Sequence, residues 1–230
     1  MSDYDAFAPI YDDWSAHMTE DVAWYVALAR EANGPIVELA VGNGRVAVPV
    51  ALETGRTVIG IDSSAAMLAG ARERATAAGV ELDLREGDMR ELALDEPAGL
   101  VYCPFRSLLH LPTWTDRRRT FERVAASLRP GGRFAWNAFV FSHQIAAGND
   151  GVHQVVNGIA HTVHHFPHDN RLDIVLDDDG KVSLWWVTRS EWEGLIEVAG
   201  LEFEALYGGF QNEPFAEGSG EFVWVARRPL

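Results

Sequence analysis

Short apolar runs alternate with longer stretches of helical periodicity between residues 36 and 139. Alternation of this kind requires right-handed crossovers and a mainly parallel sheet, with helices covering both faces. The pattern therefore predicts an α/β, Rossmann-like fold. The predicted strands are 36–41, 57–61, 81–85, 99–103 and 133–139, and the predicted helices between them are 45–53, 64–78 and 113–128.

The pattern changes after about residue 140. Segments 152–164 and 172–187 are rich in β-branched and aromatic residues, and the acidic turn at 177–180 separates strands. We interpret 141–187 as an antiparallel β insertion after strand five. A helix at 188–199 and two closing strands at 201–206 and 221–227 then complete a seven-stranded sheet whose last strand is antiparallel.

This organisation predicts three units. Residues 1–33 form an N-terminal helical lid segment, and residues 34–140 with 188–230 form the main domain. Residues 141–187 form a cap over the substrate. Four aromatic residues of the first unit have helical spacing, so this segment either closes over a ligand as a lid or simply packs on the domain; they are Tyr4, Phe7, Tyr11 and Trp14.

Charge and composition exclude several classes of partner. The 230 residues carry a formal net charge of -15, which would repel a nucleic-acid backbone, and the basic run Arg117–Arg119 is interpreted as a solvated helix face. No apolar run approaches the ~20 residues that span a bilayer, so no membrane partner is expected. The single cysteine, Cys103, favours a reducing cytoplasm, and we expect a monomer or homodimer.

A glycine turn follows the first predicted strand. Gly42, Asn43 and Gly44 precede a helix, and Asp62 ends the next strand, 18 residues after Gly44. Glycine allows close backbone approach to a ligand, the helix N-terminus presents N–H groups, and an acid at this position can accept both ribose hydroxyls. Because Gly42-x-Gly44-x-x-Ala47 also fits a dinucleotide fingerprint, this segment alone leaves NAD as an alternative.

Two further acids favour a positively charged adenosine cofactor. Glu38 lies inside the first strand, where a carboxylate is unfavourable unless it is paired, so it suits a cation better than a pyrophosphate. Asp88 lies in Gly87-Asp88-Met89 at the end of the third strand. It can accept a hydrogen bond from an exocyclic amine, while Met89 packs on a flat ring.

These motifs together resemble the class I S-adenosylmethionine-dependent methyltransferases. Residues 38–44 follow the family's first motif, with Ala40 where glycine is usual, and 87–89 and 129–132 match later motifs. The resemblance implies S-adenosylmethionine as cofactor, with Asp62 at the ribose and Asp88 at the adenine. The expected cofactor-binding set is Tyr11, Glu38, Ala40, Gly42, Asn43, Gly44, Arg45, Asp62, Ser63, Met67, Gly87, Asp88, Met89 and Phe105.

A narrower likeness concerns the acceptor. The chain length, the N-terminal tyrosines, the β insertion and segment 105–111 are similar to small-molecule N-methyltransferases that act on amino sugars. This likeness implies that His110 faces the acceptor as the catalytic histidine, and it favours nitrogen over oxygen. The predicted function is transfer of a methyl group to a nitrogen, or an oxygen, of a small molecule by in-line displacement. The alternatives are an NAD(P)-dependent oxidoreductase and a non-catalytic ligand-binding protein of the same fold.

Two remaining groups of residues give weaker indications of function. Histidines 161, 164, 165 and 168 lie in the insertion, but period-2 alternation divides them between two faces and no acid or cysteine stands at a ligand spacing. We therefore expect no metal. Trp185 and Trp186 alternate faces, so one of them is expected to line the acceptor pocket and the other to face solvent or a partner subunit.

Overall fold

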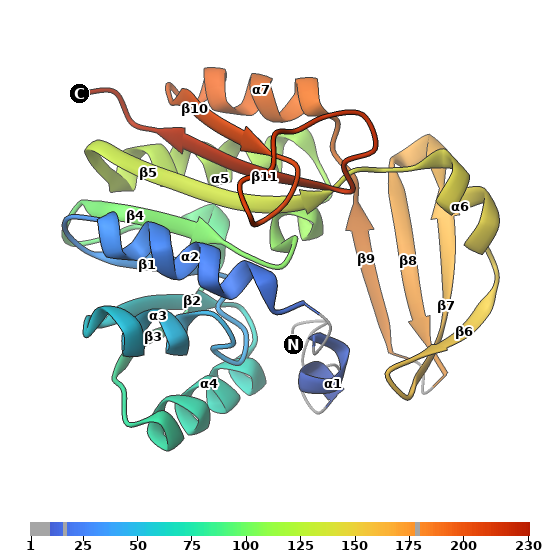
Figure 1. The fold of residues 1–230 in the computed structure, drawn as a ribbon, viewed down its shortest axis with the longest axis horizontal. Coiled ribbons are helices and arrows are strands. Elements are labelled where there is room, and N and C mark those ends of the chain that lie inside the picture. Colours follow the sequence, from blue (N-terminus) through green and yellow to red (C-terminus); the bar gives the residue numbers. More distant parts are fainter. Residues whose placement is uncertain (1–9, 16–17, 178–179) are drawn as a thin grey trace.

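The computed structural model describes residues 10–15, 18–177 and 180–230 (Figure 1). Tyr4, Phe7, Asp178 and Asp179 lie outside the described residues. Two sheets organise the chain: one of seven strands with helices on both faces, and a smaller one of four strands beside it.

The larger sheet has the strand order β10-β11-β5-β4-β1-β2-β3. β11 pairs antiparallel with both β5 and β10, and the other neighbours pair parallel. This arrangement confirms the predicted fold class, including the antiparallel last strand. The strands are β1 Ile36–Leu39, β2 Val58–Asp62, β3 Leu82–Glu86, β4 Ala98–Cys103, β5 Leu128–Phe139, β10 Glu202–Tyr207 and β11 Glu221–Arg227.

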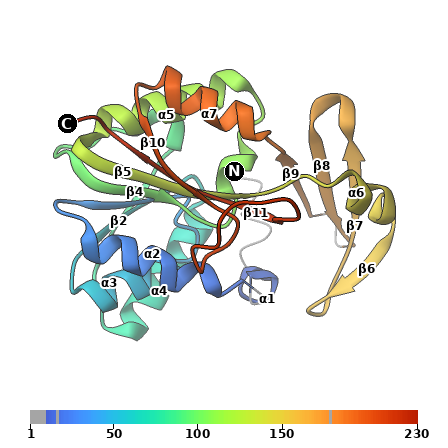
Figure 2. The ribbon, with the colours of Figure 1, turned by 45° about the horizontal axis from the view of Figure 1, so that its top comes forward.

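Helices α2 (Glu20–Glu31), α3 (Ala47–Thr54) and α4 (Ala65–Ala78) cover one face of this sheet (Figure 2). Their apolar sides bury Tyr25, Val50 and Leu68 against Ile36 and Leu100 of the central strands. Ser64 caps α4 by accepting a hydrogen bond from the Met67 backbone N–H. The first four strands consequently end together at one edge, above the N-termini of α3 and α4.

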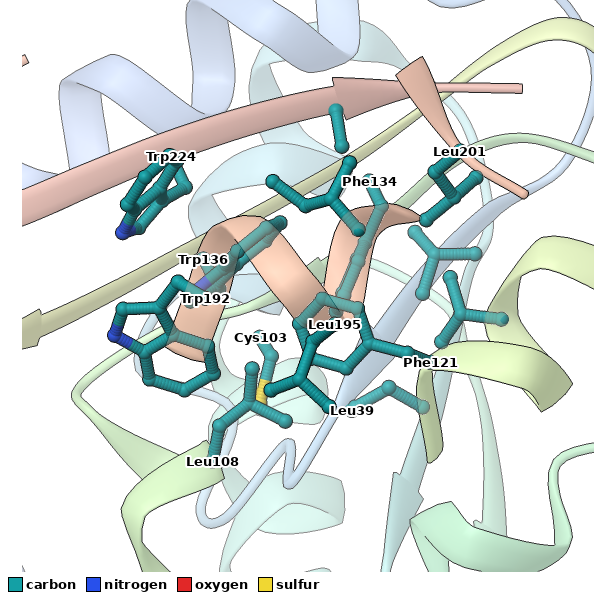
Figure 3. Close-up of a cluster of buried hydrophobic side chains, with 14 of the residues drawn as sticks. Leu39, Cys103, Leu108, Phe121, Phe134, Trp136, Trp192, Leu195, Leu201 and Trp224 are labelled. Atoms are coloured by element: carbon teal, nitrogen blue, oxygen red, sulfur yellow. The ribbon is translucent and has the colours of Figure 1, made fainter. Parts of the chain in front are cut away.

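Helices α5 (Trp114–Ser127) and α7 (Arg189–Val198) cover the opposite face. Figure 3 shows the core between them and the sheet, in which Trp136, Trp192 and Trp224 pack around Phe121 and Phe134. The Trp136 and Trp224 rings stack with centroids 5.8 Å apart. Most of the tryptophans of this face therefore serve packing.

The second sheet is the antiparallel insertion, with strand order β6-β7-β8-β9. Its strands are β6 His153–Val156, β7 Ile159–Phe166, β8 Arg171–Leu176 and β9 Lys181–Trp185. Two features were not predicted: helix α6 (His143–Asn149) precedes β6, and the 3-10 turn η5 (Pro167–Asp169) joins β7 to β8. Helix α1 (Tyr11–Ser15) contributes Trp14 to a small apolar cluster with Leu176 and Val182 of the insertion.

Three local expectations are corrected. The first strand ends at Leu39 and helix α3 begins only at Ala47, because Ala40 and Gly42 adopt left-handed backbone angles that neither element accepts. Arg117 does not face solvent: it is 7% exposed, and its guanidinium donates to the Leu111 carbonyl and to Glu191. Trp186 is also buried, stacked on Phe141 at 3.8 Å between ring centroids.

Candidate functional site

The glycine turn after β1 is built from left-handed backbone. Ala40 has φ 52°, Gly42 φ 55° and Gly44 φ 79°. A Cβ at Gly44 would lie 3.3 Å from the Val48 side chain and 3.4 Å from the Ala71 Cβ, so the turn fits closely against α3 and α4. The two glycines are thus required by both angle and space, whereas Ala40 holds an angle that favours glycine.

Asp62 fixes this turn from the end of β2. One carboxylate oxygen accepts the Gly42 backbone N–H at 2.8 Å, and the other accepts the Ser64 backbone N–H at 2.8 Å. An ionised carboxylate offers about four acceptor positions, so one side chain can accept from several donors at once. Asp62 can therefore shape the turn and still accept hydrogen bonds from a ligand.

Asp88 follows the end of β3 by two residues and caps the 3-10 turn η3 (Met89–Glu91). It accepts the Arg90 backbone N–H at 2.8 Å and is also held by the Arg90 guanidinium, with Nη2 at 2.5 Å. Arg90 extends to Asp116 on α5 at 2.8 Å. Hydrogen bonds from the Arg90 side chain hold the pKa of Asp88 below its ordinary value, so this carboxylate is ionised at neutral pH.

One cavity of about 450 Å³ connects these strand ends with the insertion. It is lined by ten of the expected site residues, including His110, and by residues of η3, of the 3-10 turn η4 (Ser107–His110) and of β9. The lining residues are Tyr11, Ala40, Gly42, Ile61, Asp62, Ser63, Met67, Gly87, Asp88, Met89, Arg90, Ser107, His110, Leu111, Pro112, Lys181, Val182, Ser183 and Trp185.

Five expected residues do not line this cavity. Glu38 and Asn43 are buried, and Gly44 and Phe105 are used in packing. Arg45 forms a two-pronged ion pair with Asp21, with N···O distances of 2.8 and 2.5 Å, and stands 4.9 Å from the centre of the Phe105 ring. These contacts attach α2 and the segment after β4 to the glycine turn.

Glu38 is the most unusual titratable group near the turn. Its side chain lies in β1 and is 1% exposed, and Oε2 has no hydrogen-bond partner among the described residues. Burial raises its pKa to about 8, although the nearby Tyr102 hydroxyl and Arg45 both act in the opposite direction. At neutral pH the acid is therefore largely protonated as long as no further positive charge stands near it.

His110 occupies the last position of η4. Its Nδ1 lies 3.2 Å from the backbone carbonyl oxygen of Ser183 in β9. A carbonyl only accepts, so Nδ1 carries the proton and Nε2 bears the lone pair of the neutral ring. The insertion thereby sets the tautomer of the histidine expected to be catalytic.

Helix α1 forms one side of the cavity. Tyr11 is 8% exposed, and its hydroxyl would stand 3.8 Å from a Cβ placed on Gly42. Asp12 accepts a hydrogen bond from Asn43 Nδ2 at 2.7 Å and pairs with Arg74 of α4. Asn43 of the turn thus contacts helix α1 and does not line the cavity.

Sequence reasoning missed most of the residues that come from β9 and η3. Lys181, Ser183 and Trp185 lie on one face of β9, because side chains alternate along a strand, and all three line the cavity. This alternation would have predicted them as a group if the strand had been known to border the cavity. Trp185 lines the cavity, as one of the tryptophan pair was expected to do. Arg90 stands beside the expected Asp88 and was not singled out.

The other candidate features do not form a competing site. Among the described residues there is no group of three or more histidines, cysteines or acids placed to hold a metal, and no helix long and apolar enough to cross a membrane. A shallow hollow on α5 is larger, about 590 Å³, but its arginines already pair with acids: Arg118 with Glu122 and Arg119 with Glu91.

The sheet order, the glycine turn and the two acids at neighbouring strand ends define a class I methyltransferase fold and site. The comparisons with known proteins agree. Residues 36–132 match the family model described as a methyltransferase domain.

Three relatives extend the likeness beyond that segment. The chain is 26% identical to the 27-O-demethylrifamycin SV methyltransferase of Amycolatopsis mediterranei, over 98% of this chain and 95% of the relative. It is 27% identical to a dTDP-3-amino-3,4,6-trideoxy-alpha-D-glucopyranose N,N-dimethyltransferase of Streptomyces venezuelae, over 93% and 91%. The crystal structure of an S-adenosylmethionine-dependent methyltransferase from Clostridium acetobutylicum superposes with a TM-score of 0.82 at 14% identity, covering 99% of both chains.

The chain is therefore a class I S-adenosylmethionine-dependent methyltransferase, and S-adenosylmethionine is its methyl donor. This resolves the choice that the glycine spacing left open in favour of a methyltransferase over a nicotinamide-dependent oxidoreductase.

Proposed function

We propose that this enzyme transfers a methyl group to a nitrogen or oxygen of a small molecule bound between η4 and β9, with His110 as the base. The observation that carries the proposal is the single cavity in which the strand-end acids Asp62 and Asp88 meet His110 and the β9 residues. On this proposal the cofactor and the acceptor share that one cavity.

The residues of the cavity fit the cofactor. On this proposal the Asp62 carboxylate accepts hydrogen bonds from the ribose hydroxyls, the Asp88 carboxylate accepts one from the adenine amine, and Met89 offers an apolar surface for the ring. When bound, S-adenosylmethionine supplies an electrophilic methyl group on a positively charged sulfur. Buried Glu38 lies behind the turn as an acid whose ionisation a nearby positive charge would favour.

His110 has a role only if the acceptor must lose a proton. The leaving group is a neutral thioether, so the main work of the residues is to hold the acceptor in line and to exclude water. With Nδ1 donating to Ser183, the Nε2 lone pair can take a proton from a hydroxyl or an ammonium group.

The acceptor is proposed to be a small molecule on three grounds. The net charge of -15 opposes a nucleic acid. The relatives at 26% and 27% identity are named for methylation of a rifamycin hydroxyl and of an amino sugar. Residues 141–187 are proposed as the cap of the acceptor site and residues 1–33 as its lid, because β9 and Tyr11 both line the cavity.

Titration calorimetry tests the cofactor half of the proposal. S-adenosylmethionine and S-adenosylhomocysteine should bind to the enzyme, and NAD should not. Labelled methyl transfer from S-adenosylmethionine to a panel of hydroxyl and amino compounds, including ansamycin hydroxyls and amino sugars, then distinguishes oxygen from nitrogen. His110→Gln should abolish most turnover while leaving binding of S-adenosylhomocysteine intact; full turnover in that variant would remove His110 from the chemistry.

A further inference from the structure

The turn that follows β4 contains two successive non-glycine residues in the left-handed region. Phe105 has φ 55° and Arg106 φ 64°. Side chains disfavour this region, so two neighbouring residues hold it only where surrounding contacts overdetermine the backbone. The turn leads directly into η4, because the Arg106 carbonyl accepts the Leu109 backbone N–H at 2.9 Å. Its geometry therefore sets where η4 and His110 lie.

The side chain of Arg106 is anchored on a distant strand. Its guanidinium makes a two-pronged contact with Glu221 of β11, with Nη2 2.8 Å and Nε 3.2 Å from the carboxylate. Glu221 is 9% exposed and also accepts Asn137 Nδ2 of β5 at 2.7 Å. Asn137 is fully buried and in turn accepts the Tyr25 hydroxyl at 3.0 Å.

This chain of contacts is built across three elements: Tyr25 is in α2, Asn137 in β5 and Glu221 in β11. None of the three lines the cavity. A charge-assisted, two-pronged contact combined with a buried amide is a geometrically specific arrangement. The chain of contacts ends at the turn formed by Phe105 and Arg106. Ser107 and His110, which follow that turn, line the cavity.

We propose that Arg106 and Glu221 are positioning residues for His110. Their ion pair, held by Asn137, keeps the turn at Phe105 and Arg106 in its left-handed conformation, so that the His110 ring reaches the Ser183 carbonyl. The significance of this placement for catalysis rests on the proposed function. Through the Arg106–Glu221 pair, strand β11 would thus influence which ring nitrogen of His110 carries the proton.

Nitrogen-15 NMR of the imidazole rings tests this without an acceptor. The His110 signals are assigned by their loss in His110→Gln. In the wild type, His110 should be a single Nδ1–H tautomer. In Glu221→Gln that single tautomer should be lost, with Nε2–H appearing. Arg106→Lys, which keeps the charge but loses the planar fork, should give the same direction of change.

Two controls separate positioning from general damage. His161 is the internal control, since its Nδ1 lies 3.1 Å from the Ile159 carbonyl and should keep its tautomer. Glu202→Gln removes an exposed ion pair with Arg227 across the β10–β11 ladder and should leave His110 unchanged. Binding of S-adenosylhomocysteine should stay within about twofold in Glu221→Gln.

An unchanged His110 spectrum in both Glu221→Gln and Arg106→Lys would overturn the proposal. Loss of the single tautomer at both His110 and His161 would overturn it as well. Failure of the wild type to bind S-adenosylhomocysteine would instead refute the proposed function, and the NMR comparison would still report on the ion pair. The two failures are therefore distinguishable.

Discussion

Glu38→Gln should remove a large pH-dependent contribution to the stability of the ligand-free enzyme. Burial raises the pKa of Glu38 from an ordinary 4.5 to about 8. Between these two pH values Glu38 therefore keeps its proton in the folded protein, whereas the same side chain has already released it in the unfolded chain. The stability contributed by protonated Glu38 is complete below pH 4.5 and is lost as the pH rises through about 8.

The size of this effect follows from the interval. Each pKa unit corresponds to about 1.4 kcal/mol, so the wild type should lose about 5 kcal/mol through this one group across the whole range. Glutamine cannot ionise but has nearly the same shape. The free energy of unfolding of Glu38→Gln relative to wild type should thus rise with pH and level off above about pH 8.

Urea unfolding of both proteins between about pH 5 and about pH 9 measures this difference. Glu86→Gln is a matched control, because Glu86 is an exposed carboxylate at the end of β3. It should leave the pH dependence unchanged. A difference between Glu38→Gln and wild type that stays constant across the range would refute the reasoning, since it would mean that Glu38 ionises normally in the fold.

Three further outcomes are expected. Asp62→Ala should weaken S-adenosylmethionine binding at least tenfold, about 1.4 kcal/mol, by calorimetry; near-normal affinity would remove Asp62 from the site. Ala40→Gly should stabilise the protein by about 1 kcal/mol in urea unfolding, because it relieves φ 52°, and a loss of stability would contradict this. Asp12→Ala should speed S-adenosylhomocysteine dissociation by up to about fivefold in stopped flow, because it detaches α1 from Asn43, and an unchanged rate would count against α1 as a lid.

The fold and the cofactor half of the site were predictable because their signals are local. Each strand, its turn and the acid at its end are contiguous in sequence, and parallel strands bring their carboxyl ends to one edge without further information. Asp62, Asp88 and Gly42 could therefore be placed together before their distances were known. His110 was placed by resemblance, and it lies in the same cavity.

The acceptor half could not be predicted in the same way, because it depends on contacts between distant segments. Ser183 reaches His110 only because β9 of the insertion folds back beside η4. Arg117 and Arg118 are neighbours in one basic run, yet Arg117 is buried on Leu111 and Glu191 while Arg118 remains at the surface. Which of these arginines is buried depends on the segments that pack against α5, and the composition of the run does not indicate it.

The charges around the glycine turn are unequally matched. Arg45 is the cation behind the turn, and its guanidinium is taken by the two-pronged contact with Asp21. Glu38 is therefore left without a counterion of its own, which is consistent with its raised pKa. A ligand that brings a positive charge would lower that pKa and release a proton, whereas the same ligand without the charge would not.

That asymmetry distinguishes methyl donor from product. Calorimetry at neutral pH, in buffers of different ionisation enthalpy, should show release of roughly one proton when S-adenosylmethionine binds. Release should be smaller for S-adenosylhomocysteine, whose sulfur is neutral, and absent for either ligand in Glu38→Gln. Equal proton release for the two ligands would show that Glu38 does not sense the charge on sulfur, and its burial would then serve the fold alone.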